Sequence, residues 1–289
     1  MNAPASPEKF LNRELKLRIA SAIVLAIIVL FMTWIGGKTF QLLWAAIALF
    51  IYNEFSNITK ISLPAMPKMA GLAFLLLVIA AYLGGQLMAA EGILLLGFAL
   101  LALWEWITSR TILAALGLCY AGLPFIAMSE LRLDTLSGLL LVVIVFACVW
   151  GADVFAYFAG RSIGGPKLAP RISPKKTWAG FIGGITGGVF LSWSVVVYAG
   201  KQPGFVFFGL VILVAVASQV GDLVESVLKR RFDVKDSGTL IPGHGGVLDR
   251  VDGLIFSAVL LWGILYIVQW NSSFDNTIPV IFDNVFLSP

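Results

Sequence analysis

Long apolar runs separated by short polar segments follow one another along the whole chain. Read as hydropathy windows, they give nine candidate membrane spans, at residues 17–35, 39–53, 69–89, 91–108, 111–128, 136–160, 177–199, 204–228 and 251–270. An apolar helix needs roughly 20 residues to cross a bilayer, and the second window is the shortest. The strands of a membrane β-barrel would instead alternate polar and apolar residues over about ten positions. The pattern therefore predicts an all-α, polytopic transmembrane helix bundle.

The composition supports a bilayer as the solvent of this chain. Hydrophobic residues make up 59% of the sequence and charged residues only 12%, whereas a soluble domain carries about 25% charged residues. Nine spans in 289 residues leave no room for a large soluble domain. Cys119 and Cys148 both lie inside apolar runs without a partner at short spacing, which is typical of buried packing.

Lysine and arginine are distributed unequally between alternate loops. With nine spans and a cytoplasmic N-terminus, 17 of the 20 lysine and arginine residues fall in cytoplasmic segments, all except Lys38, Arg132 and Lys201. Positively charged loops stay in the cytoplasm, so this orientation is the predicted one. The net charge of +4 follows from the same rule, and we predict no nucleic-acid partner. A basic cytoplasmic face also favours anionic lipid head groups and nucleotides.

A change in composition near residue 135 divides the chain. Residues 1–135 hold spans with weakly charged loops, and we interpret them as a scaffold for dimer or lipid contacts. Residues 136–271 form the predicted catalytic region with two polar cytoplasmic loops, and residues 272–289 form a non-cytoplasmic tail. No internal repeat of the inverted kind found in transporters is present.

The densest polar signal runs from the end of the eighth span to the start of the ninth. Four residues share one helical face by their spacing: Ser218, Asp222, Glu225 and Lys229. This face should not meet lipid, because carboxylates inside spans are costly and usually mark a functional path. Asp249 and Asp252 open the ninth span, where they can converge with Asp222. An ion-pair lattice that only holds the helices together is the alternative.

The residue types around these carboxylates suit phosphate chemistry. Carboxylate oxygens favour Mg²⁺, which keeps waters and substrate phosphate oxygens among its ligands. Four cations could neutralise phosphates: Lys229, Arg230, Lys235 and Arg250. Gly245 and Gly246 would let the backbone approach a ligand. His244 is the only histidine, so we predict a phosphate donor or a structural loop residue there and not a zinc site.

A second polar cluster runs from the sixth span into the next loop. Asp153 lies inside the predicted span, while Lys175 and Lys176 are expected to start the seventh helix. Paired lysines at a cytoplasmic helix end are often only topology anchors. Ser173 and Thr177 lie beside them and can cap a helix or donate to phosphate. The cluster therefore favours binding of a triphosphate or a lipid phosphate.

Three segments together carry a family resemblance. The first has three parts: Ser226-Val-Leu-Lys-Arg, Lys235-Asp236, and Ile-Pro-Gly-His244-Gly-Gly-Val-Leu-Asp249-Arg250-Val-Asp252. The second is Ser173-Pro-Lys-Lys-Thr-Trp-Ala-Gly, and the third is Trp150-Gly-Ala-Asp153. The first resembles, without a departure, the signature of the phosphatidate cytidylyltransferases, or CDP-diacylglycerol synthases. The matching region covers residues 150–253.

The resemblance implies a multi-pass enzyme of the inner (plasma) membrane whose active site faces the cytoplasm. Its substrates would be CTP and phosphatidate, and its products CDP-diacylglycerol and pyrophosphate. It also implies a homodimer, a requirement for Mg²⁺ with K⁺ as a further cation, and Asp222 and Asp249 as metal ligands. The residues assigned to catalysis are Asp222, Asp249, Lys229, Arg230, Lys235, Asp236, His244 and Asp252. Those assigned to substrate binding are Ser173, Lys175, Lys176, Thr177, Asp153, Arg250, Gly245 and Gly246.

Three other functions are alternatives to this one. A CDP-alcohol phosphotransferase would need Ala-Arg shortly after Asp-Gly, but Asp252-Gly253 leads into Leu-Ile-Phe-Ser. A cytidylyltransferase acting on another lipid phosphate stays open. An ion-coupled transporter could use the intramembrane carboxylates, although the polar residues gather at one membrane face and not at the midplane.

Overall fold

The computed structural model describes residues 7–60, 65–241, 245–271, 278–279, 281–282 and 287–288. Nine helices run through these residues: α1 (Pro7–Ile35), α2 (Gly37–Ile58), α3 (Ala65–Leu83), α4 (Leu87–Ser109), α5 (Leu113–Arg132), α6 (Leu136–Ser162), α7 (Trp178–Tyr198), α8 (Phe205–Arg231) and α9 (Leu248–Asn271). Each predicted span overlaps one of them, so the all-α prediction is confirmed for the bundle.

Seven of the described helices, α3 to α9, are long and apolar enough to cross a membrane. The apolar part of α1 that the structure describes, Ile19–Ile35, is shorter. Helix α2, which carries Lys38 and Glu54, is not among the helices that are long and apolar enough to cross. The chain is therefore a polytopic helical membrane protein.

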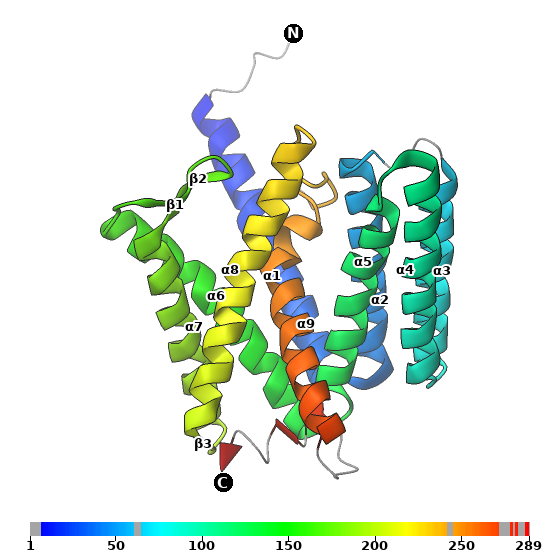
Figure 1. Cartoon of the computed structure of the whole chain (residues 1–289). Helices are drawn as coiled ribbons and strands as arrows, with labels where there is room; N and C mark the ends of the chain where they lie inside the picture. The colour runs from blue at the N-terminus through cyan, green and yellow to red at the C-terminus, as the bar shows by residue number, and fades with distance from the viewer. Residues whose placement is uncertain are drawn as a thin grey trace.

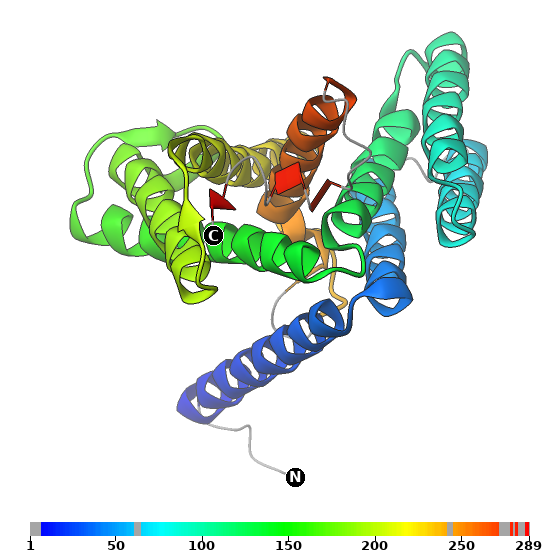
Figure 2. The ribbon, with the colours of Figure 1, turned by 90° about the horizontal axis from the view of Figure 1, so that it is seen from below.

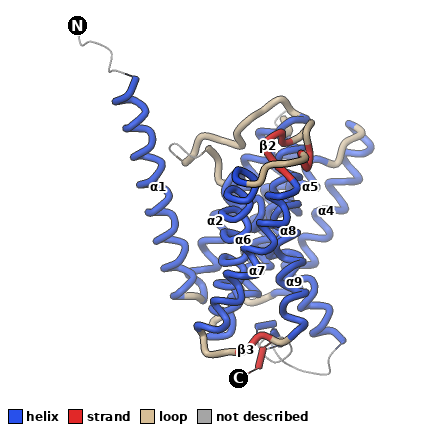
Figure 3. The backbone as a smooth tube through the Cα atoms, turned by 90° about the vertical axis from the view of Figure 1, so that its left-hand side faces the viewer, coloured by secondary structure: helices blue, strands red, loops and turns tan. Residues whose placement is uncertain are grey.

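Helix α8 lies at the centre of the half of the molecule that α6 to α9 form (Figure 1). It contacts α6 and α7 on one side and α9 on the other, while α9 also packs against α5. Helices α2, α3 and α4 surround α5. Seen from below, α1 crosses the outside of this assembly, where it contacts α2 and α6 (Figure 2). In the side view it stands apart from the other helices over much of its length (Figure 3).

Small residues bring the helices α6 to α9 into close contact. A Cβ atom on Gly184 of α7 would lie 2.9 Å from the Ala152 carbonyl oxygen of α6. One on Gly253 of α9 would lie 2.6 Å from Ser218 Oγ of α8. In a bilayer, association depends on such close packing because lipid is as apolar as the helix surfaces. The polar residues on α6, α8 and α9 are thereby held near one another.

Two pairs of short antiparallel strands lie outside the helices. Strands β1 (Lys167–Ala169) and β2 (Ser173–Thr177) form a hairpin between α6 and α7. Strands β3 (Gln202–Pro203) and β4 (Leu287–Ser288) pair near the C-terminus. The hydropathy pattern does not predict them, because each has only two to five residues.

The hairpin corrects one prediction. Lys175 and Lys176 were expected to start the seventh helix, but they lie on β2, and α7 begins at Trp178. Pro174 disfavours helical backbone at the residue before it. Thr177 is also extended, and its hydroxyl oxygen caps α7 by accepting a hydrogen bond from Gly180 N at 3.1 Å. The lysines therefore project from an extended segment beside the helix end.

Candidate active site

The polar face of α8 is turned into the molecule, as its residue spacing predicts. Ser218 and Glu225 are buried, with 1% and 2% of their surface exposed. Lys229 and Glu225 form an ion pair one helical turn apart. Asp222 lies at the edge of this face, where its side chain is 41% exposed and lines a cavity.

This cavity has a volume of about 670 Å³ and lies between α6, the β1–β2 hairpin, α7 and α8. Five predicted site residues line it: Asp153, Lys175, Lys176, Thr177 and Asp222. It therefore brings together residues from both polar clusters of the sequence. Three further polar residues that were not assigned to the site also line it: Tyr157, Arg161 and Gln219.

An ion pair across this cavity joins the hairpin to α8. Lys176 Nζ lies 2.7 Å from Asp222 Oδ2 and also donates to the Gln219 carbonyl oxygen at 3.5 Å. The Ser226 hydroxyl donates to the other carboxylate oxygen of Asp222 at 3.4 Å. Both members of the pair are partly exposed to the cavity, at 23% and 41%. A phosphate could therefore reach Lys176, and a cation could reach Asp222.

A second cluster holds the start of α9 against α8. Lys229 Nζ lies 2.6 Å from Glu225 Oε2 and 2.7 Å from Asp249 Oδ1. The other oxygen of Asp249 accepts hydrogen bonds from the backbone N–H groups of Ser237 and Gly246, both at 2.9 Å. Lys229 thus neutralises two carboxylates, and Asp249 fixes the loop that precedes its own helix.

Glu54 of α2 belongs to this cluster although it was not predicted. Its carboxylate accepts hydrogen bonds from the Ser237 hydroxyl at 3.1 Å, from Val247 N at 2.9 Å and from Leu248 N at 2.8 Å. Backbone N–H groups at a helix start lack partners within the helix and lie at the positive end of its dipole. A single acidic residue next to a candidate span was the signal that could have identified Glu54.

The glycines before α9 have a packing role in this arrangement. A Cβ atom on Gly246 would overlap the Ser237 hydroxyl and the Glu54 carboxylate. Gly245 has a φ angle of +86°, in the region that favours glycine. The loop between α8 and α9 can close around Glu54 only because both residues lack a side chain.

Three carboxylates from different helices gather beside the cavity. Asp153 of α6 and Asp222 of α8 line the cavity, and Asp252 of α9 lies next to this wall, where its backbone packs against Gly221 of α8. No group of three or more His, Cys, Asp or Glu residues in the described part of the chain forms a ready metal cage. Mg²⁺ is usually bound by one or two carboxylates together with substrate phosphates and waters. The donor set therefore fits an ion whose shell a phosphate ligand completes.

The remaining predicted residues that the structure describes do not line the cavity. Arg230, Lys235 and Asp236 are exposed at the end of α8 and in the loop that follows. Ser173 lies on β2 opposite Ala169 and does not line the cavity. Arg250 lies in the first turn of α9, near enough to Asp153 to offset its charge. His244 lies outside the described residues.

The fold and this site define a polytopic membrane protein whose charged cavity suits phosphate-bearing ligands. Residues 16–268 match the model of the Cytidylyltransferase family. A phosphatidate cytidylyltransferase of Brucella melitensis biotype 1 is 44% identical over 254 residues, which cover 86% of this chain and 92% of that protein. The one from Bacillus subtilis is 35% identical over 268 residues, covering 87% and 98%. The chain therefore belongs to the cytidylyltransferase family.

Proposed function

We propose that this chain transfers the cytidylyl group of CTP to phosphatidate, giving CDP-diacylglycerol and pyrophosphate for phospholipid biosynthesis. The observation that carries this proposal is the partly exposed pair of Lys176 and Asp222 on the wall of the 670 Å³ cavity. It offers a cation to phosphate and a carboxylate to metal within a membrane bundle. The proteins to which the chain is similar bear the name of this activity.

The chemistry asks little of the protein beyond positioning and charge. A phosphate oxygen of phosphatidate attacks the α-phosphorus of CTP, and the bond from that phosphorus to the bridging oxygen breaks as pyrophosphate leaves. A phosphate monoester has its second pKa near 6, so it is already ionised at neutral pH and needs no strong base. The residues must instead reduce the repulsion between two anions and stabilise the leaving group.

The cavity residues divide this work by their charge. Lys175 and Lys176 neutralise phosphate oxygens from the hairpin, and Arg161 adds a guanidinium from α6. We propose that Asp222 and Asp249 bind Mg²⁺, with K⁺ as a further cation. Both Asp249 oxygens have partners in the structure, Lys229 at Oδ1 and two backbone N–H groups at Oδ2, so binding of the ion requires Oδ1 to leave Lys229. Bound Mg²⁺ would supply positive charge to the triphosphate.

The proposed membrane arrangement has nine crossings, a cytoplasmic N-terminus and a site that faces the cytoplasm across the inner membrane. The positions of Lys38, Arg132 and Lys201, the three cations predicted to be non-cytoplasmic, support this arrangement. Lys38 donates to the Leu83 carbonyl oxygen and Arg132 to that of Thr33, so both lie at the end of the bundle where α1 meets α2. Lys201 lies between α7 and β3, at the end of α8 opposite to the cavity. The homodimer stays a proposal that rests on the family resemblance.

The experiment that tests the reaction uses purified protein with phosphatidate, CTP and Mg²⁺. Pyrophosphate release and CDP-lipid formation are compared between wild type and Asp249→Asn. We expect at least about a 100-fold loss, since a group that contributes several kcal/mol of charge stabilisation is removed. Asp134→Asn changes an exposed aspartate after α5, far from the cavity, and should retain activity.

The remaining outcomes separate the alternatives. Activity with another lipid phosphate but not with phosphatidate would keep the chemistry and change the substrate. Absence of CTP consumption with every acceptor would contradict the proposal and favour an ion-coupled transporter.

A further inference from the structure

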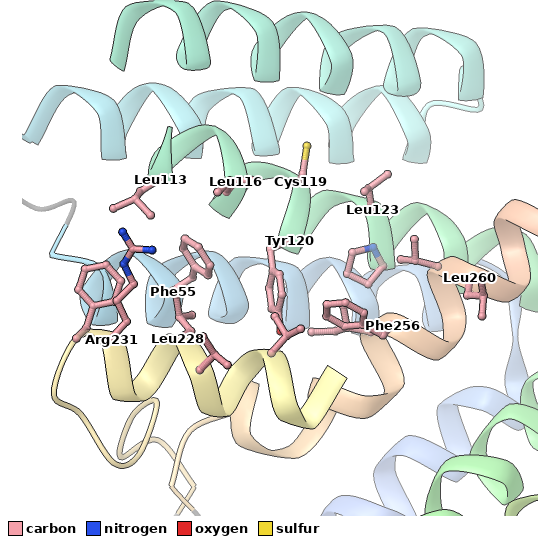
Figure 4. A pocket seen from close by; sticks show the side chains of 16 residues that line it. Phe55, Leu113, Leu116, Cys119, Tyr120, Leu123, Leu228, Arg231, Phe256 and Leu260 are labelled. Carbon is pink, nitrogen blue, oxygen red and sulfur yellow. The ribbon is translucent and has the colours of Figure 1, made fainter. Parts of the chain in front are cut away.

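A second cavity lies on the other side of α8 from the catalytic one. It has a volume of about 600 Å³ and is bounded by α5 and α2 on one side and by α8 and α9 on the other. Figure 4 shows aromatic and aliphatic side chains from all four helices around it. Its inner wall contains the rings of Phe55, Tyr120 and Phe256, whose successive centroids are 5.5 and 6.1 Å apart. We call this cavity the α5–α9 groove.

The groove and the catalytic cavity use different faces of α8. Val224, Val227, Leu228 and Arg231 line the groove, at the i, i+3, i+4 and i+7 spacing of one helical face. Asp222 and Gln219 line the catalytic cavity. Helix α8 therefore separates the two, and the groove is not part of the cavity in which the reaction is proposed.

Arg231 is the only charged residue among those that line the groove. It lies in the last turn of α8, and its guanidinium extends toward Leu113 and Phe55 at one end of the groove (Figure 4). Lys229, two residues earlier, is held by Glu225 and Asp249, whereas no ion pair joins Arg231 to another described residue. One end of an apolar groove thus carries an exposed cation.

This combination matches the chemistry of a membrane phospholipid. An apolar groove beside a bilayer suits an acyl chain, and a guanidinium at its polar end can bind a phosphate through two hydrogen bonds. The apolar flank of a helix from a second copy would leave the Arg231 guanidinium without a negative partner, whereas an anionic head group supplies one. Charge complementarity therefore favours a phospholipid as the occupant.

We propose that the α5–α9 groove binds one anionic membrane phospholipid, with its phosphate on Arg231 and an acyl chain between α5 and α9. This site is additional to the proposed catalytic one. It would keep a lipid against the wall of α8 opposite to the cavity.

The test uses the full chain in phosphatidylcholine nanodiscs, without CTP. Two photoactivatable probes carry a diazirine on an acyl chain, one a phosphatidylglycerol and the other a phosphatidylcholine, and labelled peptides are mapped by mass spectrometry. We expect labels to concentrate on groove residues such as Leu116, Val227 and Phe256. Labelling should be about fivefold stronger with phosphatidylglycerol, the effect of one cation near an anionic head group.

Two variants separate the head group from the chain. Arg231→Gln should reduce phosphatidylglycerol labelling to the phosphatidylcholine level, while the matched control Arg110→Gln, at the end of α4, should leave it unchanged. Leu116→Trp fills the groove and should reduce labelling by both probes, with thermal unfolding and gel filtration confirming an intact fold. Labels spread evenly around the bundle, equal labelling by both probes in wild type, or cross-links between two copies through the groove would overturn the proposal.

Discussion

Lys176 is the residue at which the proposed phosphate binding and an ion pair with a carboxylate meet. Its ammonium group lies 2.7 Å from Asp222, and both residues line the 670 Å³ cavity. Ion pairs that remain partly exposed contribute only about 0–1 kcal/mol to stability. The main effect of this pair should therefore appear in catalysis.

Replacement of Lys176 by glutamine should lower kcat/KM for CTP by about 10- to 100-fold, the effect of losing a charged hydrogen-bond donor to phosphate. The thermal unfolding temperature should hardly change. Steady-state kinetics with varied CTP measure the first effect, and a thermal unfolding scan the second. Lys175→Gln, on the same strand but without the Asp222 contact, should cause a smaller loss of kcat/KM for CTP. Equal losses in the two variants would show that the ion pair has no special role.

Replacement of Lys229, unlike that of Lys176, should lower the stability of the protein, because its ammonium group is the shared partner of Glu225 and Asp249. Lys229→Met leaves two adjacent carboxylates uncompensated, and breaking such a pair costs about 3 kcal/mol. We expect a fall of several degrees in the unfolding temperature in detergent. The double variant Lys229→Met/Glu225→Gln removes one of the stranded charges and should be more stable than the single variant. Additive losses would contradict this reading of the cluster.

Among the elements, α2 has a role beyond packing. Glu54 connects it to the start of α9 through Val247 N and Leu248 N, and to the loop through Ser237. Glu105 of α4 is arranged similarly, since its carboxylate accepts from Ala114 N and Ala115 N at the start of α5. Both carboxylates are buried, at 5% and 3% exposure. Only Glu54 contacts the loop that holds Asp249.

This pair of helix-capping carboxylates provides a matched comparison. Glu54→Gln places an amide donor against backbone donors, so it should disorder the loop and lower kcat by at least about tenfold, with a smaller change in KM for CTP. Glu105→Gln should lower the unfolding temperature comparably but leave kcat near the wild-type value. If the loss of kcat in both variants is proportional to the fall in unfolding temperature, Glu54 is only a structural residue and not a positioning one.

The elements also show what hydropathy can predict and what it cannot. All nine candidate spans overlap helices, because apolar run length reports directly on the bilayer. The predicted ends of the spans are less accurate. The third window runs to residue 89, but α3 ends at Leu83. Gly84 and Gly85 follow it, and Gly85 has a φ angle of +81°. A hydropathy window cannot detect such a turn between apolar residues.

For the site, residue type and local spacing predicted the inward face of α8 and the polar residues of the hairpin. Glu54 was missed because its contact with Leu248 spans 194 residues, and no local pattern records a contact of that range. Gln219 was missed because an uncharged side chain at the end of an apolar span carries little signal. Its amide donates to the Phe181 carbonyl oxygen of α7, at 3.0 Å.

At the scale of the whole molecule, the cavity and the cluster around Asp249 both lie at one end of the bundle. The hairpin and the loop between α8 and α9 lie there, while β3 and the C-terminal strand lie at the opposite end (Figure 1). A water-soluble nucleotide and a membrane lipid can meet only where a polar cavity reaches the membrane surface. The proposed reaction therefore requires that this end face the cytoplasm, where CTP is made.

Helix α2 decides the number of crossings, since of the nine described helices it alone is neither one of the seven candidate spans nor a shorter apolar helix. Single cysteines at Lys38 and Asn57, near its two ends, would report on it in a chain lacking Cys119 and Cys148. With nine crossings, a membrane-impermeant maleimide should label Lys38→Cys in intact cells but Asn57→Cys only after permeabilisation.

Lys201→Cys and Lys235→Cys, beyond the two ends of α8, serve as reference positions for the outside and the inside. If Lys38→Cys and Asn57→Cys were labelled from the same side, α2 would not cross. The structure places the two ends of α2 at opposite ends of the bundle, with Lys38 against Leu83 and Glu54 against the start of α9, so this result would contradict the fold as well as the crossing count. Because α2 would no longer reverse the chain, α1 would have to start on the outer side for the cavity to remain cytoplasmic. Labelling of the two α2 positions from opposite sides, with Asn57→Cys on the side of Lys235→Cys, therefore shows that α2 crosses and that Lys38 lies outside. A crossing of α1 then places the N-terminus in the cytoplasm.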